Sequence, residues 1–262
     1  MALEIDQHHQ LASSIQRWDP RFKIASLGIF VLGVAVLQTL PLAMVALLLA
    51  IGFCRISRLP YAFVKQGLAW VVPFLLPFFL ILPFSYPGTA AYHVLGLPFA
   101  WEGLRLAALI FLKAVAIVMI SYVIFGSARF DVSMIALQRL RCPAIFVQMI
   151  LFTYRYTYVF IDEMRRMNTA MSTRGFVKRM DLHTFRVVGG FVGTLLIRSF
   201  ERTERVFKAM LSKGFQGEFH TLVEFSAGPR DAAKMVLVVG VIVVLTVCDR
   251  IGPFHAAIQA WY

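Results

Sequence analysis

Charged residues are scarce in this chain. Lys, Arg, Asp and Glu make up 15% of the 262 residues, whereas soluble domains carry roughly a quarter. Acidic residues are the scarcer kind, with 14 against 26 basic ones, which leaves a net charge of +12. Hydrophobic residues make up 59% of the chain, among them 24 Phe. This balance excludes an ordinary soluble domain and indicates an integral membrane protein.

The sequence also lacks the motifs that carry most enzyme chemistry. Its three cysteines form neither a C-x-x-C pair nor a zinc-ligand spacing. It contains no G-x-x-x-x-G-K-[ST] phosphate loop and no H-E-x-x-H metal motif. It has no aromatic-basic platform for nucleic acid, so the basic excess indicates cytoplasmic loops. We therefore expect no catalytic site, no metal site, no cofactor and no nucleic-acid partner in this chain.

Apolar stretches predict about five membrane spans. Residues 24–54 carry no charge and are interrupted by Thr39-Leu40-Pro41, which favours a tight hairpin of two helices with both basic flanks on one side. Residues 66–84 form a third span, whose prolines predict kinks, so we expect it packed inside the bundle or partly broken. A fourth span ends near Phe125, and residues 232–247 form the last. The amino terminus is predicted to be cytoplasmic and the carboxy terminus outside.

Lys113 lies inside the fourth predicted span. A charge at that depth is costly, which makes this membrane-buried residue a candidate for function. The alternative is structural: Lys113 faces the bundle and bonds to carbonyl oxygens or a polar partner, or it extends to the interface.

The composition changes after Gly126. Residues 127–230 hold sixteen of the 26 Lys and Arg residues, and no proline lies between Pro143 and Pro229. Such sequence predicts long amphipathic helices. Residues 144–160 could cross the membrane, but Arg155 and three tyrosines favour an interfacial or buried helix.

A second long helix is predicted from about Asp181 to Lys213, a length on the order of 50 Å. Gly189 and Gly193 are four residues apart within it, and small residues let two helices approach closely. We therefore expect the two long helices to cross near Gly189 and Gly193. The chain then divides into a membrane bundle of four spans with a cytoplasmic amino terminus (1–126), a cytoplasmic module of long helices (127–230) and a final transmembrane helix (231–262).

One pattern within this module occurs twice, 39 residues apart. Asp162, Arg166, Ala170, Met171, Arg174, Gly175 and Phe176 return as Glu201, Arg205, Ala209, Met210, Lys213, Gly214 and Phe215. Residues four apart share one face of a helix, so each copy predicts a stripe of acid, Arg, Ala and base, with the acid and the first Arg paired. The last cation suits the helix dipole in the final turn, and the glycine permits the left-handed conformation that ends a helix.

The two matched helix ends are the candidate functional site. The alternative is ordinary support of a solvated helix, worth a few tenths of a kcal/mol per ion pair. Ala170 and Ala209 leave space beside the stripe, and a cation beside Phe176 or Phe215 is typical of an interface hot spot. Two copies favour a dimeric or two-lobed partner.

Three stretches of the chain match a known family: Trp18-Asp19-Pro20-Arg21-Phe22-Lys23, Thr153-Tyr154-Arg155-Tyr156 and residues 198–210. On these residues the chain resembles the transmembrane (T) component of energy-coupling factor transporters, in the cobalt/nickel subgroup (CbiQ-like). The family's two X-Arg-Gly motifs fall on Thr173-Arg174-Gly175 and Ser212-Lys213-Gly214. The family prefers Ala-Arg-Gly, and a Lys cannot make the two-pronged contact of an Arg.

This resemblance implies an L-shaped, all-α scaffold, with about five transmembrane helices and two long cytoplasmic coupling helices. It implies two ABC-type ATPases as partners, which bind ATP and Mg and receive Arg174 and Lys213. It further implies a membrane substrate-binding subunit that holds the metal ion, and a multi-pass location among the lipids of the bacterial cytoplasmic (inner) membrane. The expected role is non-catalytic coupling for cobalt or nickel uptake. A vitamin cargo such as biotin, or a membrane-embedded enzyme that uses Lys113 on a lipid phosphate, are the alternatives.

Overall fold

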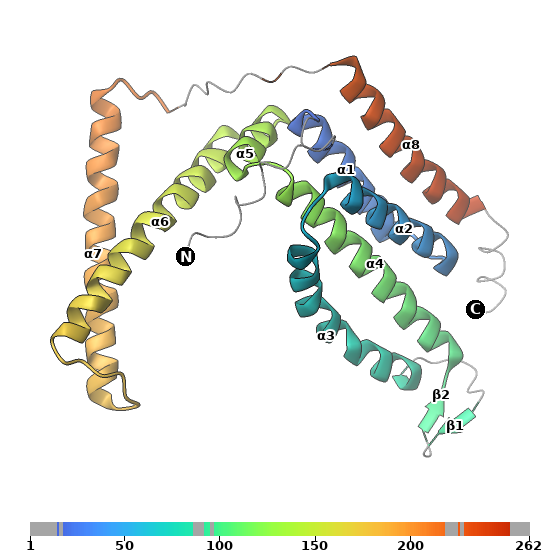
Figure 1. The fold of residues 1–262 in the computed structure, drawn as a ribbon, viewed down its shortest axis with the longest axis horizontal. Helices are drawn as coiled ribbons and strands as arrows, with labels where there is room; N and C mark the ends of the chain where they lie inside the picture. Colours follow the sequence, from blue (N-terminus) through green and yellow to red (C-terminus); the bar gives the residue numbers. More distant parts are fainter. Residues whose placement is uncertain are drawn as a thin grey trace. The chain divides into compact units, whose positions relative to one another are not determined.

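The computed structural model describes residues 15, 18–85, 92–94, 97–217, 225 and 228–251. Within them the chain is almost entirely helical (Figure 1), and the prediction of an all-α membrane protein is confirmed. A two-stranded antiparallel hairpin, β1 (Tyr92–Val94) and β2 (Leu97–Phe99), is an addition to it. The helices are α1 (Pro20–Val36), α2 (Leu40–Ser57), α3 (Tyr61–Ser85), α4 (Trp101–Gly126), α5 (Phe130–Arg139), α6 (Ala144–Thr173), α7 (Leu182–Ser212) and α8 (Pro229–Ile251).

The chain forms two compact units. The bundle unit comprises residues 3–140 and 224–262, and the long-helix unit comprises residues 141–223. The bundle unit holds α1 to α5, the strands and α8, and the long-helix unit holds α6 and α7. The predicted division after residues 126 and 230 concerns location relative to the membrane, and it stays a prediction.

Five of the described helices are long and apolar enough to cross a membrane: α2, α3, α4, α6 and α8. The number agrees with the predicted five spans, but the set differs. α1 has 17 residues, about 25 Å of helix, which is short for a complete crossing. α6 is long and apolar enough to be a candidate membrane span, although it contains Arg155. The chain is thus a multi-pass membrane protein, and the interfacial placement of 144–160 stays a prediction.

The predicted break between two helices near the start of the chain is confirmed, whereas their arrangement as a tight hairpin of two spans stays a prediction. Leu37–Thr39 separate α1 from α2. Pro20 and Pro41 each lie in the first turn of a helix, where the missing N–H breaks no intrahelical bond. Asp19 caps α1, because its carboxylate accepts a hydrogen bond from the Arg21 N–H at 2.9 Å.

α4 is the centre of the bundle unit, since it packs against α1, α2 and α3, while α8 packs against α1. The buried side of α2 consists of small residues, with Ala43, Ala46 and Ala50 at helical spacing. Small side chains let apolar helices approach closely and gain dispersion contacts. Phe30 of α1 and Ile120 of α4 are fully buried in the core that results.

The expectation that the third span lies inside the bundle is wrong. Three residues of α3 are buried, whereas Trp70 and Phe74 are 81% and 73% exposed. The prolines do not break α3, which is one helix of 25 residues. α3 packs on α4 along one side, with Phe79 of α3 edge-on to Phe111 of α4 at 5.6 Å between ring centroids. Lipid is an apolar solvent, so apolar side chains on the other sides need no protein cover.

The long-helix unit consists of two helices of 30 and 31 residues, each about 45 Å long. The predicted second long helix is confirmed, because Asp181 is the amino-terminal cap of α7 and Lys213 its carboxy-terminal cap. The Asp181 carboxylate accepts a hydrogen bond from the Thr184 N–H at 2.8 Å. Hydrogen bonding from Thr184 also lowers the pKa of Asp181.

An ion pair between Glu163 of α6 and Arg198 of α7 joins the long helices. The expected crossing point is not where the helices meet in this structure. A Cβ built on Gly189 or Gly193 meets no atom within 4 Å, so neither glycine is needed there for a close approach of α6. A close helix contact at these glycines in an assembled complex stays a prediction.

Candidate functional site

The end of α6 has the backbone geometry that its sequence predicts. The Phe176 N–H donates to the Met171 carbonyl oxygen at 3.1 Å, and the Gly175 N–H donates to that of Ser172 at 3.0 Å. Gly175 has φ = +79°, in the left-handed region that favours glycine. These features make a Schellman motif, which satisfies two of the carbonyl groups that a helix end leaves without partners.

The end of α7 repeats this geometry. The Phe215 N–H donates to the Met210 carbonyl oxygen at 3.1 Å, and the Gly214 N–H donates to that of Leu211 at 2.9 Å. Gly214 has φ = +82°. The sequence echo therefore corresponds to two helix ends with the same hydrogen bonds and the same left-handed glycine.

Arg174 and Lys213 lie one position beyond the last helical residue, as the caps, and not in the last turn as expected. Both are exposed, and neither makes a side-chain hydrogen bond or an ion pair with another described residue. Arg174 precedes α7 and Lys213 follows it, so the length of α7, about 46 Å, separates them along the chain. The structure therefore presents two separate cationic points with matching backbones.

The residues around the two cations leave the surface beside them exposed to solvent. The Thr173 hydroxyl donates to the Ala170 carbonyl oxygen at 3.0 Å, and the Ser212 hydroxyl donates to that of Lys208 at 2.9 Å. These two hydroxyls therefore bond within their own helices. Ala170 and its counterpart Ala209 are exposed, while the two phenylalanines, at 176 and 215, are half-buried.

The ion pairs predicted within the echo are wrong. Asp162 pairs with Arg165 at 3.6 Å, and not with Arg166 four residues away. In the second copy Glu204 pairs with Lys208 at 2.8 Å, while the predicted pair of residues 201 and 205 does not form. Neighbours at i+3 and i+4 are both within reach on a helix, and exposed pairs differ little in energy. Arg166 and Arg205 are consequently exposed cations on the stripe.

Lys113 helps to hold the break between α1 and α2. Its Nζ donates a hydrogen bond to the Leu37 carbonyl oxygen at 2.7 Å. Beyond the break, the Asp249 carboxylate accepts hydrogen bonds from the Gln38 N–H at 2.8 Å, the Thr39 N–H at 3.0 Å and the Thr39 hydroxyl at 2.6 Å. A cation thus meets the carboxyl end of α1 and an anion meets the amino end of α2, as helix dipoles favour. These contacts favour the structural reading of Lys113.

Asp249 is a buried charge that the sequence reasoning missed. It lies near the end of α8 and is 5% exposed. The sequence signal that could have revealed it is the position of Asp249 just after the apolar stretch 232–247. Because Arg250 follows directly, this pair of charges looks like the ordinary polar end of a helix. Its partner Thr39 is 210 residues away, so no local pattern links the two.

The entry motif, residues 18–23, fastens the start of α1 to two other elements of the bundle unit. The Trp18 indole N–H donates to the Asp231 carbonyl oxygen in the first turn of α8 at 3.2 Å. Lys23 is 1% exposed, and its Nζ donates to the Ser127 hydroxyl, just beyond α4, at 3.0 Å. The motif therefore has a structural role within the bundle.

Among the described residues, no group of three or more His, Cys, Asp and Glu side chains is arranged to hold a metal ion. Asp249, the acidic residue near Lys113, accepts hydrogen bonds from backbone N–H groups at the start of α2, which is how a side chain caps a helix. We therefore find no described cluster in this chain to which metal chemistry can be assigned.

Comparisons with known proteins cover nearly the whole chain. The CbiQ family model, described as cobalt transport protein, matches residues 12–222, a range that includes the entry motif and both helix ends. The chain is 21% identical over 251 residues to uncharacterized protein MJ1571 of Methanocaldococcus jannaschii, which covers 94% of this chain and 86% of that protein. Uncharacterized protein MJ1089 of the same organism is 27% identical over 85 residues, 32% of this chain and 31% of its own length.

Proposed function

The chain belongs to the CbiQ family of cobalt transport proteins, and we propose that it is the energy-coupling scaffold of an ATP-driven importer for cobalt or nickel ions. In this role it carries the motion of two ABC-type ATPase subunits to a separate membrane subunit that binds the metal ion. ATP and Mg²⁺ are bound by the ATPases in this proposal, and the chain itself performs no chemistry.

The pair of matched helix ends is the observation that carries the proposal. Two ATPase subunits of one kind present two equivalent receptors, and Arg174 and Lys213 present two equivalent cations on identical backbone caps. Exposed cations without partners in the described chain are available to acidic groups on another protein. The separation of the ends by the whole of α7 suits two receptors better than one.

The long helices suit the transmission of force. A continuous helix of 31 residues, capped at both ends, moves as a unit when one end is displaced. The ion pair of Glu163 with Arg198 couples α7 to α6. Motion imposed at either helix end therefore reaches the other helix.

α7 also has an apolar face that is exposed among the described residues. Phe185, Leu196 and Phe200 are 73%, 64% and 72% exposed and share one side of the helix. Together with Val192 they form a patch of the kind that marks a contact with another protein or with lipid. We assign this face to the metal-binding membrane subunit, which then rides on the moving helix.

The proposal is tested by removing the two cations. Truncation of a charge that is paired across an interface costs about 2–5 kcal/mol, or roughly 30-fold to several thousand-fold in affinity. We expect Arg174→Ala to abolish copurification of the ATPases and ATP-dependent uptake of cobalt. Lys213→Ala should have a smaller effect, because a Lys makes one point contact where an Arg makes two.

Two matched variants control for general loss of charge. Lys178→Ala removes an exposed cation four residues after Arg174, and Lys208→Ala removes one five residues before Lys213. Both should leave assembly and transport intact. If the double variant of Arg174 and Lys213 still assembles and transports as the parent does, the helix ends are not the ATPase contacts.

A further inference from the structure

A groove opens between α2 and α3 in the bundle unit, at the end of the bundle where α2 finishes and α3 begins. Both helices pack along α4 but scarcely touch each other, so α4 forms the floor of the space between them (Figure 1). The groove has a volume of about 440 Å³, which is in the usual range of small-molecule sites. Its lining residues are Ile51, Cys54, Arg55, Tyr61, Ala62, Val64, Lys65, Leu68 and Met119.

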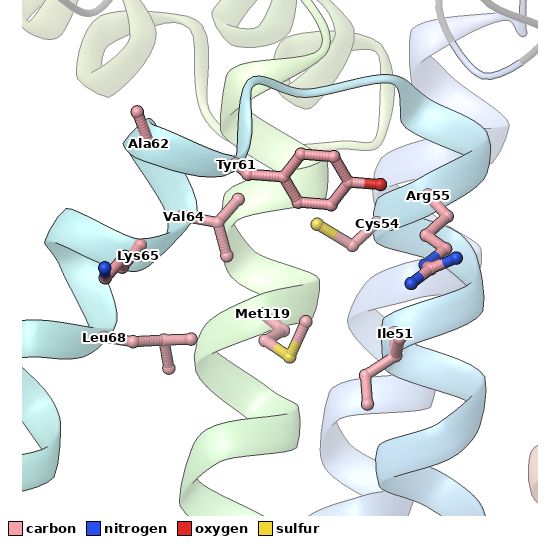
Figure 2. Close-up of a pocket in the computed structure, with 9 residues that line it drawn as sticks. All are labelled: Ile51, Cys54, Arg55, Tyr61, Ala62, Val64, Lys65, Leu68 and Met119. Atoms are coloured by element: carbon pink, nitrogen blue, oxygen red, sulfur yellow. The ribbon is translucent and has the colours of Figure 1, made fainter.

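The lining divides into an apolar floor and a cationic rim. Cys54 of α2, Val64 of α3 and Met119 of α4 are buried and form the deepest part. Figure 2 shows Arg55 on the α2 wall and Lys65 on the α3 wall, on opposite sides of the gap. An anion that enters between the two walls therefore meets Arg55 on one side, and the long, flexible Lys65 side chain, whose ammonium is turned away from the gap in Figure 2, can swing toward it from the other.

The rim cations have no counter-charge in the part of the chain that the structure describes. Among the described residues, Arg55 and Lys65 make no side-chain hydrogen bond and no ion pair, and no acidic residue lines the groove. Both are exposed, and Tyr61 beside them is 70% exposed. Tyrosines and basic residues at the ends of apolar helices are typical of the level of lipid headgroups.

We propose that this groove binds one anionic phospholipid. Its phosphate lies between Arg55 and Lys65, and one acyl chain lies along Ile51, Leu68 and Met119. Basic pockets between transmembrane helices are recognised sites for anionic headgroups, because the cations add to the apolar burial of the chain. The lipid takes the place of protein contacts between α2 and α3, and so supports α3, which otherwise packs on α4 and, near its end, on β2.

The test measures the lipid preference of the purified chain. Phosphatidylglycerol and phosphatidylcholine with the same acyl chains are titrated into the protein in neutral detergent, and bound lipid is counted by native mass spectrometry. We expect one phosphatidylglycerol to bind at least tenfold more tightly than phosphatidylcholine. Arg55→Gln and Lys65→Gln should each weaken phosphatidylglycerol about fivefold and leave phosphatidylcholine unchanged.

The matched control is Arg58→Gln. Arg58 is exposed and carries the same charge at the cap just beyond the end of α2, but it does not line the groove. It should change the affinity less than twofold. A third arm adds inorganic phosphate, which should not displace the lipid, because the acyl chain supplies much of the binding.

Several results would overturn the proposal. Equal affinity for the two lipids would remove the role of the cations, and an equal loss in Arg58→Gln would make the preference a general effect of surface charge. Displacement by millimolar phosphate would make the groove a site for a free anion. If the lipids do not discriminate but Arg55→Gln weakens copurification of a membrane partner, the groove holds a protein helix and not a lipid.

Discussion

Removal of the Asp249 side chain should destabilise the bundle more than any other single truncation of a charge in it. The carboxylate accepts from two backbone N–H groups and one hydroxyl at the break between α1 and α2. Asp249 is 5% exposed and Thr39 is 1% exposed, so water does not readily replace the lost acceptor. Non-helical backbone is tolerated within a membrane protein only where such groups have partners.

The structure sets the size of the effect. In Asp249→Ala the N–H and the hydroxyl of Thr39, which is buried, lose their acceptor, and each buried donor without a partner costs about 1–3 kcal/mol. The expected loss is therefore about 2–6 kcal/mol. Asp249→Asn keeps one carbonyl oxygen and should lose less, about 1–2 kcal/mol. Lys113 interacts electrostatically with Asp249 and bonds to the same break, so the effects of Lys113→Met and Asp249→Asn should not add.

Thermal unfolding of the purified chain in mild detergent, followed by tryptophan fluorescence, measures this effect. A loss of 2–6 kcal/mol corresponds to a melting temperature lower by roughly 5–20 °C for a chain of this size. Arg250→Ala is the control, because Arg250 is the exposed neighbour on the same helix. The reasoning fails if Asp249→Ala melts within about 1 °C of the parent, or if Arg250→Ala melts as low.

Three further changes test other parts of the fold. Gly103→Ala should lower stability by about 1–3 kcal/mol, because its Cβ would lie 2.4 Å from a backbone oxygen of α3; Gly28→Ala, whose Cβ meets nothing within 4 Å, should not. Gly175→Ala should cost about 1–2 kcal/mol at the end of α6, where φ is +79°, and should weaken ATPase binding although no charge is lost. Because the pKa of Asp181 is lowered in the folded protein, the Asp181 cap stabilises α7 fully above the pKa of the unfolded state, and this stabilisation is lost as the pH falls through the folded-state pKa. The Thr184 amide signal in NMR spectra should report the resulting fraying of the helix end. In Asp181→Asn this signal should no longer depend on pH.

The helix ends were predictable because helix caps are local. A left-handed residue after the last turn is needed within three or four positions, and glycine supplies it at 175 and 214. The break between α1 and α2 was predictable for a related reason: a proline in the first turn of α2 and the charges that flank residues 24–54 are properties of adjacent residues.

Predictions that depended on neighbours in space succeeded less well. The prolines of α3 describe its backbone and do not say which side of the helix meets protein, and the structure leaves Trp70 and Phe74 exposed. The glycines at 189 and 193 permit a close approach but do not require one, and the long helices meet instead at Glu163 and Arg198. The ion pairs of the echo failed because an exposed Asp162 has two arginines within reach.

The sequence by itself determined what each segment is: a charge-poor bundle, two long amphipathic helices, and two glycine caps that each carry a cation. These properties follow from composition and from spacings shorter than one heptad, which the backbone converts directly into structure. Tertiary structure alone decided which distant groups meet. Asp249 reaches Thr39 across 210 residues, and Lys113 reaches Leu37 across 76. Such contacts depend on how whole helices pack, because a buried polar group is satisfied by whichever partner the packing brings within 3 Å.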